Sequence, residues 1–168
     1  MSNRKTSRKI LHIIFSVASL LCVAFIWSNS LKDASASGSD SGRVLAWLNS
    51  VLESVGIYPF LTSHIVRKAA HFSEFALLGA LLASTCLTAR RRINPWFVAS
   101  PASLAVACAD ELLQLLSHGR ACQVSDMLLD FCGAVTGITL VYLIFRLLLT
   151  RNKLSDVAAR KDDGPSIT

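Results

Sequence analysis

Charged residues are scarce in this chain of 168 residues: Asp, Glu, Lys and Arg make up 17%, against 52% hydrophobic residues. Soluble domains contain about 25% charged residues, so the composition argues against an ordinary soluble domain. The mean hydropathy of +0.49 agrees with this. Because four long apolar runs hold most of the hydrophobic residues, the sequence predicts membrane spans rather than a buried core.

Motifs for disulfide, metal or nucleotide chemistry are also missing. The five cysteines form no CxxC pair, which argues against a disulfide framework or a zinc site. There is no phosphate-binding loop, serine nucleophile motif or HExxH, so no cofactor and no metal are assigned. The 17 basic residues outnumber the 11 acidic ones, but they form no basic stripe with interleaved aromatics, which excludes nucleic acid as a partner.

The predicted fold class is an all-α membrane protein, a bundle of four transmembrane helices at about 10–27, 65–88, 96–116 and 124–149. A basic cytoplasmic N-terminus, residues 1–9, precedes the domain of residues 10–149, and a cytoplasmic tail, 150–168, is predicted to be disordered. The alternative for the first span is a signal peptide cleaved near Ala34-Ser35-Ala36. Its apolar run exceeds the about 7–15 residues of a signal peptide, so a permanent span is favoured.

The first loop, residues 28–64, is predicted to contain an extra helix. Its first part, Ser28 to Gly42, is rich in Ser, Gly and Asp and should be irregular. Apolar residues then recur at the spacing of an amphipathic helix that lies on the membrane surface or against the bundle. They are Val44, Leu45, Trp47, Leu48, Val51, Leu52 and Val55.

The positive charges orient the chain. With both termini in the cytoplasm, 12 of the 17 Lys and Arg residues lie on the inner side. This bias predicts a multi-pass protein of the cell membrane with cytoplasmic termini.

Polar and ionisable side chains gather at the outer ends of the second, third and fourth spans. On each helix they share one arc, within roughly 10 Å of the outer boundary. Each buried charge costs about 2.5–3.5 kcal/mol in a bilayer, so these groups should face the bundle and pair with one another. The candidate ligand-binding residues are Arg67, Lys68, His71, Glu74, Asp110, Glu111, Gln114, Arg120, Asp126 and Asp130.

This convergence from separate helices favours an outward-facing functional pocket over the alternative, a purely structural network of ion pairs. Gly133 and Gly137 continue the polar face of the fourth span with GxxxG spacing. Such spacing lets another helix approach closely. Packing within the chain is the favoured use of these glycines, and a homo-oligomer through them is the alternative.

At these positions the sequence resembles the VanZ-like family, small polytopic membrane proteins associated with teicoplanin resistance. The resemblance covers about residues 25–140 and departs mildly at His118, where a small loop residue is expected. It implies a four-helix membrane domain and a link to the cell envelope or to glycopeptide resistance, without an established reaction. The matching segments are Trp27-Ser28-Asn29-Ser30-Leu31, residues 67–75, residues 110–114, Gly119-Arg120, and residues 125–134 with Gly137.

The favoured function is a non-enzymatic one. Arg67, Lys68 and Arg120 would attract an anionic group, and the nearby acids would hold these bases in place. The expected partners are membrane lipids or lipid-linked cell-wall intermediates. A lipoglycopeptide antibiotic such as teicoplanin, whose engagement with the membrane would be altered, is a further expected partner.

Two alternatives stay open. A membrane enzyme could act on a lipid-linked substrate in the outer leaflet, with His71, Glu74, Asp110 and Arg120 as its catalytic residues. In one variant of this enzyme, His71 and Glu74 would help to ligate a metal. A proton-coupled small transporter would use the acids and the histidine as a relay, but the inner halves of the spans lack polar residues to continue it.

Overall fold

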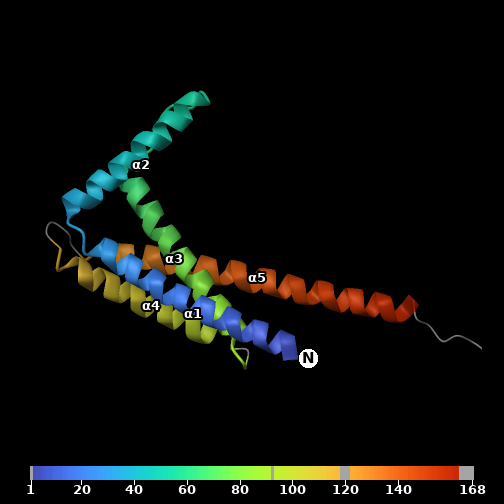
Figure 1. Ribbon diagram of the computed structural model, residues 1–168. Coiled ribbons are helices and arrows are strands. Elements are labelled where there is room, and N and C mark those ends of the chain that lie inside the picture. The colour runs from blue at the N-terminus through green and yellow to red at the C-terminus, as the bar shows by residue number, and fades with distance from the viewer. Residues whose placement is uncertain (1, 92, 118–121, 163–168) are drawn as a thin grey trace, which may run out of the picture.

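The computed structural model describes residues 2–91, 93–117 and 122–162. In these residues the chain is helical without strands: α1 (Ser2–Ser30), α2 (Ala34–Ser54), α3 (Ser63–Thr88), α4 (Pro95–Gln114) and α5 (Val124–Asp162). Helices α1, α3, α4 and α5 form an elongated bundle, and α2 projects from the end where α1 finishes (Figure 1). The predicted all-α fold class with an extra helix in the first loop is confirmed.

Four of the helices are long and apolar enough to cross a membrane: Lys5–Ser30, Ser63–Thr88, Pro95–Gln114 and Val124–Arg151. Hydrogen bonds from N-cap side chains mark where α3 and α4 begin. The Thr62 side chain accepts a hydrogen bond from the Ile65 amide, and the Asn94 side chain accepts one from the Trp96 amide. Both are N-cap contacts that satisfy amides with no partner inside the helix.

The outer surface of the bundle is strongly apolar. Leu20, Phe97 and Leu147 are 71%, 78% and 69% exposed. Inside, the bundle is narrow and built largely from small residues, with Phe75 and Leu78 as its bulky centre. Apolar side chains that face outward from a thin core are what a lipid environment requires.

Close contact between α3 and α5 depends on glycine. A Cβ atom added to Gly137 would lie 1.9 Å from the Ala76 carbonyl oxygen, and one added to Gly133 would lie 2.4 Å from that of Phe72. From the other side, a Cβ on Gly79 would meet the backbone of α5 at 2.1 Å. The GxxxG face is therefore used within the chain, which is the use the sequence favoured.

The prediction that the chain is irregular from Ser28 to Gly42 is wrong. Helix α1 continues to Ser30 and α2 already begins at Ala34. Inside α2 the serine hydroxyls do not compete with the helix, because they donate to carbonyls of the preceding turn: Ser39 to Ala36 at 2.8 Å and Ser41 to Ser37 at 2.9 Å.

The tail that the sequence predicts to be disordered, residues 150–168, begins within α5. Helix α5 continues to Asp162, well beyond the apolar run. The sequence of this extension is rich in Leu, Ala, Lys and Arg and contains no Gly or Pro before Gly164, so nothing in it stops a helix. Residues 163–168 lie outside the described residues.

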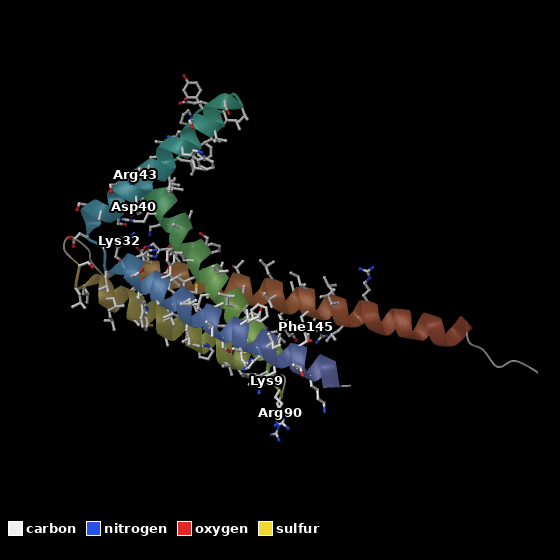
Figure 2. The ribbon with its side chains drawn as sticks, in the orientation of Figure 1. Lys9, Lys32, Asp40, Arg43, Arg90 and Phe145 are labelled. Carbon is white, nitrogen blue, oxygen red and sulfur yellow. The ribbon has the colours of Figure 1, made fainter. Side chains whose placement is uncertain are left out.

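The two ends of the bundle carry different side chains. Figure 2 shows Lys9 and Arg90 at the end where the chain begins, and Lys32, Asp40 and Arg43 at the opposite end. Lys32 and Asp40 form an ion pair at 3.2 Å that joins the end of α1 to the first turns of α2. Both side chains are about half exposed, so this pair contributes little to stability.

We expect Gly137→Ala to destabilise the protein by about 1–3 kcal/mol, because the added methyl group must push α3 and α5 apart. The matched control is Gly38→Ala in α2, where no atom lies within 4 Å of the added Cβ and alanine is the better helix former. Thermal unfolding of the purified protein in detergent measures both. Equal midpoints for the two variants would contradict the glycine contact.

Candidate functional site

Polar side chains converge at the end of the bundle where α1 finishes. Three carboxylic acids of this group are nearly inaccessible, since Asp110, Glu111 and Asp130 are 0%, 2% and 1% exposed. We call the group the polar cluster; it consists of Asn29, Ser30, Lys68, His71, Glu74, Asp110, Glu111, Gln114, Gln123, Asp126 and Asp130. Buried acids at this density need partners, because an uncompensated charge in an apolar interior is costly.

The two acids of α4 are held by hydrogen bonds. The Gln114 amide donates to Asp110 Oδ2 at 3.2 Å and to Glu111 Oε1 at 3.0 Å. The Gln123 backbone amide donates to Glu111 Oε2 at 2.7 Å. Glu111 therefore ties α4 to the segment that leads into α5.

The end of α1 completes the cluster, which reasoning from the sequence missed. The Ser30 hydroxyl donates to Asp110 Oδ1 at 2.6 Å, and the Asn29 amide donates to Glu74 Oε1 at 3.1 Å. Ser30 is fully buried, and its carbonyl oxygen also accepts from the Ser117 hydroxyl at 3.0 Å. The available signal was the run of polar residues directly after the apolar face of the first span.

The rim of the cluster holds the basic groups. Lys68 Nζ lies 2.5 Å from Asp126 Oδ1, and the two side chains are 31% and 30% exposed. The Ser125 hydroxyl donates to the same carboxylate oxygen at 3.2 Å. Arg67 lies one helical turn before His71 on α3. It is half-buried and forms no ion pair with any described acid. It therefore presents a guanidinium at the rim without a carboxylate partner.

At the centre, one side chain from each of three helices meets. The imidazole of His71 from α3, the carboxylate of Asp110 from α4 and that of Asp130 from α5 place one nitrogen or oxygen atom each within 4.8 Å of one another. His71 Nδ1 lies 3.9 Å from Asp130 Oδ1, too far for a hydrogen bond. Among the described residues neither oxygen of Asp130 has a hydrogen-bond partner.

Most of the residues predicted for the site come together. Arg67 lies at the rim without an acidic partner among the described residues, and Arg120 lies outside the described residues. Glu74 accepts a hydrogen bond from Asn29, and a ring nitrogen of His71 lies within 4.8 Å of carboxylate oxygens of Asp110 and Asp130. The predicted residues that the structure places in the cluster are Lys68, His71, Glu74, Asp110, Glu111, Gln114, Asp126 and Asp130.

A groove of about 380 Å³ lies elsewhere, between α2 and α3. Its lining includes Val44 and Leu48 from α2, and Ala69 and Ser73 from α3. At 100° per residue, the two α3 residues lie on the face opposite His71. The groove is lined almost entirely by apolar atoms, so the ionisable chemistry belongs to the polar cluster and not to this groove.

The arrangement can do two kinds of chemistry. Its rim, with Arg67 and Lys68, can receive an anionic group through charge-assisted hydrogen bonds. Its interior, with an imidazole between carboxylates, can exchange protons or hold a cation.

Comparison with known proteins places the chain in a family. The VanZ/LLP1 family model matches residues 13–146. This range includes most of the first and fourth spans, all of the second and third, and the described residues of the polar cluster. The match confirms the resemblance found from the motifs. Neither a curated protein nor a solved structure matches the chain.

We expect Ser30→Ala to destabilise the protein by about 1–3 kcal/mol, because it removes the buried donor to Asp110. The matched control is Ser28→Ala, two residues away: that exposed hydroxyl donates only to the Phe25 carbonyl of its own helix, and its removal should be nearly neutral. Thermal unfolding in detergent measures the difference. If the Ser30 variant is as stable as the Ser28 variant, the contact of α1 with Asp110 does not contribute to stability.

Proposed function

Because the chain belongs to the VanZ/LLP1 family, we propose that it is a multi-pass cell-membrane protein of envelope physiology whose polar cluster faces outward. The cluster binds the anionic part of a lipid-linked molecule, such as a cell-wall intermediate, and thereby alters how a lipoglycopeptide such as teicoplanin engages the membrane. The observation that carries this proposal is the half-buried Arg67 at the rim, which has no acidic partner among the described residues.

Arg67 and Lys68 differ in how they are held. Lys68 is fixed against Asp126 at 2.5 Å, and with about a third of its side chain exposed it keeps donors for a second partner. The N–H donors of the Arg67 guanidinium are available, and their planar arrangement matches two oxygens of a phosphate or carboxylate. An anion at the rim would contact both bases while the buried acids keep Lys68 in place.

The depth of the cluster suits a lipid-linked ligand. It lies where three candidate spans begin or end, at the level where headgroups meet the apolar core of a bilayer. Near this end α2 exposes an apolar stripe of Val44, Trp47 and Val51, which Val55 continues just after the helix. A helix with such a stripe lies in the membrane interface, so a ligand that diffuses in one leaflet can reach the rim laterally.

A second candidate function is a membrane enzyme that acts on the same class of ligand. The observation that favours it is the His71 imidazole, 20% exposed and adjacent to the two buried carboxylates. Such an imidazole can act as a general acid or base. Chemical change of a lipid-linked substrate by the purified protein, lost in His71→Gln, would favour this function over binding alone.

The first prediction tests whether the polar cluster lies on the outer side of the membrane. Cys122 is exposed near the polar cluster, and Arg90 is exposed at the opposite end. In a background in which the other cysteines are replaced, a membrane-impermeant maleimide should label Cys122 in intact cells. A cysteine introduced by Arg90→Cys should react only after the cells are opened. The reverse pattern would place the cluster on the cytoplasmic side and contradict the proposal.

The second prediction concerns antibiotic susceptibility. Expression in a sensitive Gram-positive host should lower susceptibility to teicoplanin more than to vancomycin, because only teicoplanin carries a lipid tail. Arg67→Gln should remove most of this effect, since a charge-assisted contact contributes about 1.5–3 kcal/mol, or about tenfold or more in affinity. The measurement is the minimal inhibitory concentration of both drugs at matched membrane levels of each variant.

The matched control for this experiment is Arg43→Gln, an exposed arginine of α2 outside the cluster, which should protect like wild type. Equal protection against both drugs would contradict a lipid-dependent mechanism. Full protection by Arg67→Gln would exclude the rim as the binding site.

A further inference from the structure

We propose that His71, Asp110 and Asp130 form a binding site for one divalent transition-metal ion of the first row, with Zn²⁺ as the ion to test first. The proposal goes beyond the function proposed above and does not depend on it. It assigns a cofactor to the centre of the cluster, where sequence reasoning assigned none.

The geometry supports a shared ion. One atom from each of the three side chains lies within 4.8 Å of the other two. A central point therefore exists that lies within about 2.8 Å of all three atoms. Zinc bonds to imidazole nitrogen and carboxylate oxygen at about 2.0–2.2 Å, so side-chain adjustments of less than about 1 Å would complete the three bonds.

Asp130 supplies the second, independent observation. Its side chain is 99% buried, being 1% exposed, and points into the triad. Neither of its oxygens has a hydrogen-bond partner among the described residues. A buried carboxylate without such partners is costly unless a cation or a proton neutralises it. A metal ion at the centre of the triad would neutralise it and bond to it directly.

The surroundings of the triad resemble the outer shell of a metal site. Asp110 is held at Oδ1 by Ser30 and at Oδ2 by Gln114, at 2.6 and 3.2 Å. Hydrogen bonds of this kind orient metal-bound carboxylates. The three ligands also stand on three packed helices, which fix a site better than loops do.

The donor set selects the class of metal. Calcium and magnesium prefer oxygen ligands alone. One imidazole with two carboxylates suits Zn²⁺, Mn²⁺ or Fe²⁺, and leaves coordination positions open for water or a ligand oxygen.

The test uses the full chain, purified in detergent with a tag that contains no histidine and stripped of metal with a chelator. Isothermal titration with Zn²⁺ and Mn²⁺ gives affinity and stoichiometry, and elemental analysis after gel filtration gives the metal retained. Wild type should bind one ion per chain. Asp130→Asn and His71→Gln should each weaken binding about tenfold or more.

The matched control is Glu53→Gln, which alters an exposed acid of α2 outside the polar cluster and should leave the affinity unchanged. Cys122→Ser controls for zinc capture by the exposed thiol. Folding is checked separately: Zn²⁺ should raise the thermal midpoint of wild type but not that of Asp130→Asn. Asp130→Asn without metal should be at least as stable as stripped wild type, because it removes an uncompensated buried charge.

Wild type that binds neither Zn²⁺ nor Mn²⁺ stoichiometrically would overturn the proposal. So would a folded Asp130→Asn variant with the affinity of wild type. Loss of the bound ion in Cys122→Ser together with its retention in Asp130→Asn would assign the metal to the thiol, and would also overturn it.

Discussion

The close backbone contact between α3 and α5 is the constraint on which the rest of the structure depends. Gly133 lies against Phe72 and Gly137 against Ala76, so the contact advances by four residues on both helices and the two run parallel. The Lys68–Asp126 ion pair and the approach of His71 to Asp130 at 3.9 Å extend this contact between α3 and α5 toward the starts of the two helices. Without side chains at the glycines, the helices come near enough for these short acids to reach across.

Assembly of the polar cluster costs free energy, because carboxylic acids must be buried. Five carboxylic acids lie at one end of a bundle whose sides expose large apolar residues: Glu74, Asp110, Glu111, Asp126 and Asp130. Donors from α1, α4 and the start of α5 satisfy most of them. Asp130 departs from this pattern, and departures from full polar satisfaction occur where function requires them. The proposed metal site rests on Asp130, whereas the proposed ligand site rests on Arg67 at the rim.

Part of the candidate site could be predicted from the sequence, because helical periodicity shows which residues share one face of the same helix. That Asp110, Glu111 and Gln114 share one face follows from their spacing, and Asp126 and Asp130 are one turn apart. Periodicity could not pair Lys68 with Asp126 or place His71 Nδ1 3.9 Å from Asp130 Oδ1. Those pairings depend on the register between helices. Ser30 was missed because a serine is a common residue at a helix end, and only its burial against Asp110 distinguishes it.

The sequence by itself determined the class of the protein, its four spans, the end of the bundle that holds the ionisable groups, and the family. Hydrophobicity and 3.6-residue periodicity are local properties, so they can be read along the chain. Only the tertiary structure decided that Ser28–Gly42 is mostly helical, that α1 contributes Asn29 and Ser30, and that three helices meet at His71, Asp110 and Asp130. These features depend on how closely and in what register the helices pack, and the distances between residues far apart in sequence arise only when the bundle forms.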